Sequence, residues 1–180
     1  MFDFGQAEEI EPEAIGEPGK RTFRVRVLSR GEAASLWLEK EQLAALAMAI
    51  RRLLEQTGDI GTSPDAEAPE QGGAFPEKPQ VDFKIGKLGI GYDEARRIVI
   101  VFAYEIGSAE DVGSAEDEEP QPTFSCRVTR SQCQSFADRA EEVISGGRPS
   151  CPLCSGPMEP SGHACVRSNG HTNNPILLND

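Results

Sequence analysis

The residues best suited to chemistry in this sequence lie together near its C-terminal end. Three of the five cysteines and both histidines fall in this short stretch: Cys151, Cys154, His163, Cys165 and His171. Two residues separate Cys151 from Cys154, so both thiolates can reach one ion, and His163 and Cys165 would face the same way on an extended strand. Three thiolates and one imidazole make a closed tetrahedral site, which is typical of structural zinc. The spacing therefore predicts a structural zinc ion, with either His163 or His171 as the fourth ligand.

Three other interpretations of the cysteines remain open. The first is a flexible tail with free thiols, although a segment so poor in apolar residues needs a metal to become ordered. The second is a redox Cys-x-x-Cys pair, which usually opens a helix, and Pro152, Gly156 and Pro157 disfavour a helix here. The third is a catalytic zinc, which would keep an open coordination position and usually has fewer thiolates.

A group of polar residues follows the third cysteine. Arg167, Asn169 and His171 would lie near the metal and could hold a phosphate or a carboxylate, or they could instead donate hydrogen bonds to the thiolates. The sequence contains no phosphate-binding glycine loop, no Gly-x-Ser-x-Gly and no His-Glu-x-x-His. These observations favour a non-enzymatic interaction or adaptor module. The alternative is an enzyme or accessory subunit that binds its ligand with the polar tail residues.

Two amphipathic helices are predicted upstream of this tail. The first runs from about Glu39 to Gln56, and from Leu43 onward its apolar residues recur at the spacing of one helix face. The second runs from about Arg130 to Ser145. It begins after Thr129, which forms a capping-box pattern with Gln132 three residues later.

Alternating or continuous apolar runs predict the strands of a mostly antiparallel sheet. The predicted strands cover residues 22–28, 34–38, 81–85, 98–103 and 124–128. The run at 98–103 is apolar throughout, which suits a strand buried on both faces. Gly86, Gly89 and Gly91 lie between strands rather than before a helix, so we interpret them as bends or bulges. The fold class is therefore α+β.

The sequence also contains a weak internal repeat. At an offset of 90 residues, residues 35–55 match 125–145 in apolar character, and Gln42 matches Gln132. A duplicated strand–strand–helix unit explains this match, although any strand followed by an amphipathic helix aligns in a similar way.

Charge and composition suggest how the chain is divided. Residues 1–19 are predicted to be a mobile acidic arm, 20–148 an α+β core with disordered loops near 57–80 and 105–119, and 149–180 a zinc-knuckle-like tail. The net charge of −12 is concentrated in the arm and the loops, which leaves the core mildly basic. Such overall acidity disfavours nucleic acid as a partner, so we expect a protein partner.

The compartment is predicted from the ends and the apolar runs. No run approaches the roughly 20 apolar residues that cross a bilayer, so no membrane association is expected. The acidic N-terminus is the reverse of a secretory signal, so we expect a cytoplasmic protein. Clustered cysteines in that compartment favour a metal site over a disulfide framework.

Several segments resemble an actinobacterial family of uncharacterised proteins, domain-of-unknown-function family 3090. The matching segments are residues 16–23, 38–42, 88–93, 151–154 and 162–170. The resemblance covers most of the chain, from Gly16 to His171, and its tail motif is the most specific part. It implies a cytosolic actinobacterial protein with a knuckle-type tail, and it implies no known activity. Ser155 stands where the family usually has glycine, and the position of His171 varies in the family, which favours His163 as the fourth ligand.

Overall fold

The computed structural model describes residues 1–58, 74–107 and 121–146, together with Cys151, Leu153, Cys154, Cys165 and Arg167. The strands are β1 (Phe2–Gln6), β2 (Glu9–Ile15), β3 (Thr22–Ser29), β4 (Glu32–Leu38), β5 (Val81–Asp93), β6 (Ile98–Glu105) and β7 (Phe124–Val128), and the helices are α1 (Lys40–Gln56) and α2 (Arg130–Ser145). The predicted α+β fold with a mostly antiparallel sheet is confirmed. Most of the two loops predicted to be disordered, and most of the tail, lie outside the described residues.

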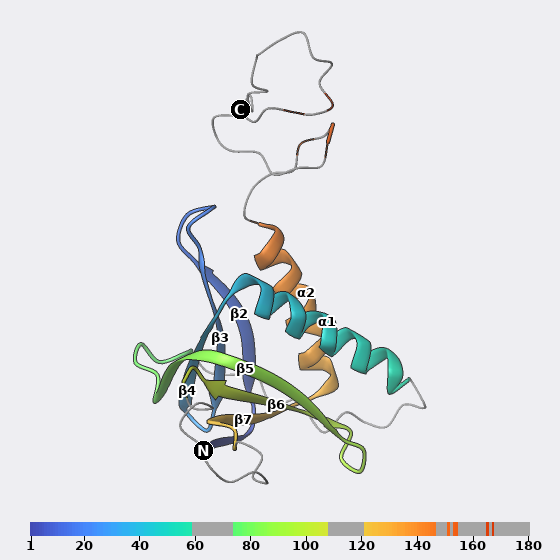
Figure 1. Ribbon diagram of the computed structural model, residues 1–180. Coiled ribbons are helices and arrows are strands. Elements are labelled where there is room, and N and C mark those ends of the chain that lie inside the picture. Colours follow the sequence, from blue (N-terminus) through green and yellow to red (C-terminus); the bar gives the residue numbers. More distant parts are fainter. Residues whose placement is uncertain are drawn as a thin grey trace.

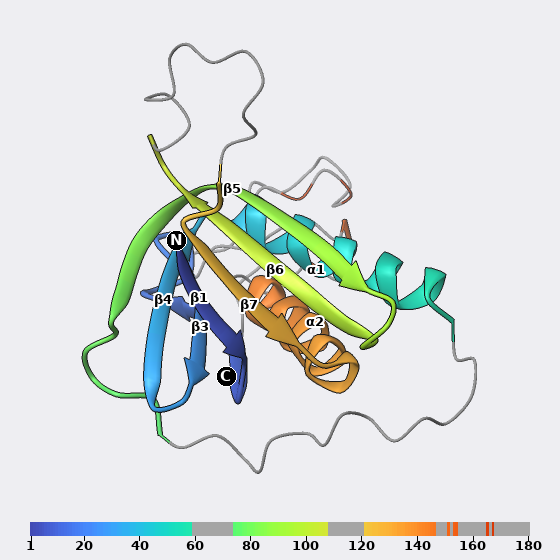
Figure 2. The same ribbon diagram turned by 90° about the horizontal axis from the view of Figure 1, so that it is seen from below.

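The strands form one sheet in the order β1-β7-β6-β5-β4-β3-β2. Strand β5 bends at Gly86, so that its first part pairs with β4 and its second part with β6, which confirms a bulge at this glycine. Strands β1 and β2 stand at opposite ends of the order, yet only Ala7 and Glu8 separate them in sequence. The N–H of Ala7 donates to the carbonyl of Arg127 (2.8 Å), and that of Glu8 donates to Leu28 (2.8 Å). The sheet therefore curls until its two ends meet, as Figure 2 shows from below.

The N-terminal segment forms part of the sheet, so the prediction of a mobile arm is wrong for residues 2–15. Along β2, Glu11 and Glu13 point outward and pair with arginines of β3, at 2.6 Å for Glu13 and Arg24 and 3.2 Å for Glu11 and Arg26. The intervening residues, such as Ile10, face the core. In the sequence, these acidic residues suggest a solvated arm. In the structure, they form ion pairs with the neighbouring strand.

Both helices cover the same face of the sheet and pack against each other (Figure 1). Their apolar faces supply much of the core, with Leu43 from α1 and Phe136 from α2 almost completely buried. At their exposed margin, the guanidinium of Arg51 contacts the carboxylates of Asp138 (3.1 Å) and Glu141 (2.6 Å). The helix bounds agree with those predicted from the apolar periodicity, because each helix buries the face that the sequence marks as apolar.

The elements repeat as two three-strand units, β2-β3-β4-α1 and β5-β6-β7-α2. Strand β4 pairs in parallel with β5, and β7 pairs in parallel with β1, so the two units join in the same way at both junctions. The matching glutamines also have matching contacts. The side-chain amide of Gln42 donates to the carbonyl of Gly86 (3.3 Å), and that of Gln132 donates to the carbonyls of Ala7 and Glu8 (3.0 Å each). The predicted duplication therefore includes one more strand per unit than expected.

Strand β6 differs from its prediction in how it is buried. Its inward side chains are at most 3 % exposed: Val99, Val101 and Ala103. The outward side chains of Ile100 and Phe102 are only half-buried, so the strand is not buried on both faces. A Cβ atom built at Gly89 or Gly91 of the neighbouring strand would contact the Phe102 ring, at 3.9 and 3.3 Å respectively. The outward residues are apolar because an aromatic ring covers glycines that have no side chains of their own.

We expect Gln132→Ala to lower the free energy of unfolding by about 1–3 kcal/mol. The variant removes the donor that the carbonyls of Ala7 and Glu8 share, and it also removes the capping acceptor for the N–H of Thr129 (3.0 Å). The matched control is Gln42→Ala, whose hydrogen bonds are exposed and should cost less. Urea unfolding of both variants measures the difference, and equal losses would contradict the role of Gln132 in closing the sheet.

Candidate metal centre

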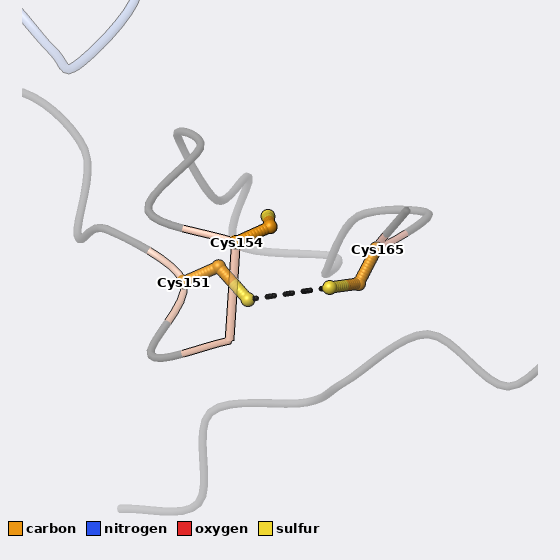
Figure 3. A group of neighbouring side chains, drawn as sticks. All are labelled: Cys151, Cys154 and Cys165. Carbon is orange, nitrogen blue, oxygen red and sulfur yellow. Dashed lines mark hydrogen bonds between the residues drawn. The ribbon is translucent and has the colours of Figure 1, made fainter. Parts of the chain in front are cut away.

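Three cysteine side chains converge in the C-terminal segment (Figure 3). The Sγ atoms of Cys151, Cys154 and Cys165 all lie within 4.8 Å of one another. The Sγ atoms of Cys151 and Cys165 are 3.7 Å apart, and both residues are buried, at 1 % and 8 % exposed. Two separate stretches of chain therefore bring their thiols to one point, as the spacing predicts.

The local backbone favours the thiolate form of Cys151. Residues Leu153 and Cys154 lie in a turn that folds back on the first cysteine. Burial raises the pKa of the Cys151 thiol, and the neighbouring Cys165 side chain also raises it. The backbone N–H groups of Cys154 and Leu153 donate to its sulfur and lower the pKa, as does the Cys154 side chain. Together they outweigh the effects that raise it, so that the pKa lies below its ordinary value. A sulfur that accepts backbone hydrogen bonds is well suited to bind a metal as a thiolate.

A hydrogen bond from Arg167 links the segment around Cys165 to the Cys-x-x-Cys turn. The guanidinium of Arg167, two residues after Cys165, donates to the carbonyl of Leu153 in the Cys-x-x-Cys turn (3.3 Å). Because Leu153 lies between the first two cysteines, this bond helps to hold them beside the third. The other two polar candidates, Asn169 and His171, lie outside the described residues.

The three thiols fit a zinc ion. Zinc binds thiolate sulfur at about 2.3 Å with tetrahedral angles, which places two ligand sulfurs about 3.8 Å apart. The 3.7 Å between Cys151 and Cys165 matches that separation, and the limit of 4.8 Å for the whole group needs little adjustment. Thiolates select soft metals such as zinc over magnesium or calcium. His163 and His171 both lie outside the described residues, so the fourth ligand stays a prediction.

The other two cysteines belong to the core. Cys126 on β7 and Cys133 on α2 are fully buried, and none of the five cysteines forms a disulfide. Burial raises the pKa of Cys126 strongly and that of Cys133 to about 12, so both remain protonated thiols at neutral pH. Within the described residues the only cluster suited to a metal is the one at Cys151, Cys154 and Cys165.

In the part of the chain that the structure describes, no helix combines the length and the apolar character needed to cross a bilayer.

Comparisons with known proteins identify a family and nothing more. No curated protein and no solved structure gives a significant match. A family model described as a protein of unknown function, DUF3090, matches residues 2–165. The matched span begins at β1, includes both three-strand units, and ends at the third cysteine of the cluster. The chain therefore belongs to the DUF3090 family of proteins of unknown function.

Proposed function

We propose that this chain is a zinc-binding cytoplasmic protein in which the metal is structural, and that it acts as a non-enzymatic interaction or adaptor module for a protein partner. The observation that carries the proposal is the convergence of Cys151, Cys154 and Cys165 at sulfur separations that suit zinc. A metal held by three thiolates and one histidine has no open position for a substrate, and its main effect is to order the segment around it.

The fourth ligand in this proposal is His163. It lies two residues before Cys165, and it falls inside the span that the family model matches, whereas His171 lies beyond that span. A ligand that belongs to the same family-wide segment as the three cysteines is the simpler choice.

The metal content of the chain tests the proposal directly. Protein purified without added metal should contain about one zinc per chain, measured by inductively coupled plasma mass spectrometry. Zinc in that amount would support a folded metal module in the tail. Protein that contains no zinc, and does not take it up after reduction, would leave the cysteines as a cluster of reactive thiols and would overturn the proposal.

The adaptor role needs a second experiment. The zinc-loaded chain and its Cys151→Ser variant serve as paired baits, because they differ in the metal module alone. Partners retained by the first bait and lost by the second would support recognition through the tail. Partners that bind both baits equally would place the interaction on the α+β core.

An enzyme or accessory subunit that binds a phosphate- or carboxylate-bearing ligand is the alternative. Arg167 would be its main anion-binding group, yet its guanidinium already donates to the carbonyl of Leu153. Calorimetry of inorganic phosphate binding to the unmodified chain and to Arg167→Ala distinguishes the ligand-binding alternative from the adaptor role. Binding that Arg167→Ala abolishes without loss of zinc would favour the alternative over the adaptor.

A further inference from the structure

Strand β5 has an edge that no other described strand covers. Its pairing with β4 ends at Trp37 and Lys84, and beyond the bend at Gly86 it pairs on one side only, with β6, as far as Asp93. Along residues 87–93 the second edge therefore carries backbone N–H and C=O groups without a strand partner in the described part of the chain. Figure 2 shows this part of β5 at the margin of the sheet. An open edge of this length is a template for another strand.

Strand β2 has the same position in the first three-strand unit as β5 has in the second, but the outer edge of β2 is blocked against pairing with another strand. Pro12 lies within β2 and has no N–H to donate, and acidic residues alternate along it from Glu9 to Glu13. Proline and charge are the usual means of blocking an open edge. Helix α2 also packs along β2, whereas α1 contacts β5 to a much smaller extent. Between Lys87 and Asp93, β5 has neither a proline nor a charged residue, so one edge is blocked and its counterpart is open.

The open segment is complementary to itself. It reads Lys87-Leu88-Gly89-Ile90-Gly91-Tyr92-Asp93, with a basic residue at one end, an acidic residue at the other, and matched residues about the centre. We propose that two copies of the chain associate by antiparallel pairing of their β5 edges, with the twofold axis at Ile90. In that register Lys87 lies opposite Asp93 of the second copy, and the same pair recurs at the other end, as a twofold interface requires.

Each face of the strand suits this arrangement. Leu88, Ile90 and Tyr92 point toward the core side and pack against it, yet all three are only partly buried. In the dimer each Leu88 would meet Tyr92 of the other copy, and the two Ile90 side chains would meet at the axis, which completes their burial. On the outward face, Gly89 and Gly91 carry no side chain that could obstruct the incoming strand.

The two charged ends are available for pairing across the axis. Lys87 is exposed, and its ammonium lies 5.4 Å from the centre of the Tyr104 ring. Asp93 accepts a hydrogen bond from the backbone of Arg96 (3.0 Å), and its carboxylate is 3.9 Å from the Arg96 guanidinium. The long separation and the 70 % exposure of Arg96 leave Asp93 able to accept a second cation.

Sedimentation equilibrium of the full chain over a range of concentrations tests this interface. A reversible monomer–dimer equilibrium is expected. Lys87→Glu should raise the dimer Kd about tenfold or more, because both attractive pairs become repulsive. Adding Asp93→Lys to Lys87→Glu reverses both charges and should restore most of the affinity. The matched control is Lys84→Glu, on the same strand and also exposed but within the part that pairs with β4.

These measurements test the β5 interface independently of whether the chain binds a metal. Weaker dimerisation of Lys87→Glu, rescue by the double variant and no effect of Lys84→Glu would support the β5 interface. A chain that stays monomeric at the highest concentrations, or a dimer that Lys87→Glu does not weaken, would overturn it. Circular dichroism and melting curves verify that each variant is folded.

Discussion

Replacement of Cys151 by serine should remove zinc from the chain. A serine hydroxyl is a poor zinc ligand, and the variant also removes the sulfur that accepts the backbone N–H groups of Leu153 and Cys154. Loss of a residue that hydrogen-bonds to a metal ligand weakens metal binding by up to about a hundredfold. Loss of the ligand itself should therefore weaken zinc binding by more than about a hundredfold. Metal content after dialysis should fall from about one zinc per chain to nearly none.

Cys133→Ala is the matched control for this variant. It also removes one thiol, but the thiol is buried in the core on α2, so the chain should keep its full zinc content. A second measurement uses the thiol reagent dithionitrobenzoate on folded chain treated with a chelator. The three tail thiols should react, whereas Cys126 and Cys133 should react only after unfolding, because they are buried and their pKa values are raised. Full zinc retention by Cys151→Ser, or zinc loss in Cys133→Ala, would contradict the assignment.

Phe4→Ala should lower the free energy of unfolding by about 3–5 kcal/mol, the usual cost of truncating a buried phenylalanine. The Phe4 side chain is 6 % exposed, and its ring centre lies 4.9 Å from that of Phe124 on β7. The variant leaves a cavity at the point where β1 meets β7 and also removes the contact between the two rings. Because small domains are stable by only about 5–15 kcal/mol, the loss should be clear in urea unfolding and in the melting temperature.

The control is Phe2→Ala, two residues earlier on the same strand. Phe2 is 51 % exposed, so its truncation should cost less than about 1 kcal/mol. If Phe4→Ala were as mild as Phe2→Ala, the N-terminal segment would not belong to the core, and the mobile arm predicted from its acidity would be the better description.

The sequence alone predicted the elements whose signals are local. Both helices were predicted because their apolar residues recur at the helical period, and Thr129 with Gln132 marked the start of the second, where the structure has a reciprocal capping box. The five predicted strands correspond to β3 through β7, because each of these strands has either alternating apolar and polar residues or a continuous apolar run. The repeat at an offset of 90 residues was visible for the same reason, since it compares two local patterns.

The cysteine cluster was also predictable, because its three members lie close together in sequence. A Cys-x-x-Cys turn can bring two thiols to one ion with no help from the rest of the fold, and Cys165 follows soon after. The structure adds that the three sulfur atoms do converge and that Arg167 bonds back to the turn. The choice between His163 and His171 stays a prediction.

Only the tertiary structure decided how the sheet closes and which edge stays open. Strand β2 was missed because Glu11 and Glu13 pair with arginines on β3. Strand β1 was missed because it pairs with β7 at the other end of the core, where its Asp3 contacts Arg127. The amide of Gln132 meets Ala7 across 125 residues of sequence, a contact that no local period can indicate. The open edge of β5 likewise depends on where β4 stops pairing with it. Periodicity shows which side of an element faces the core, whereas the partner at its edge is set by long-range packing.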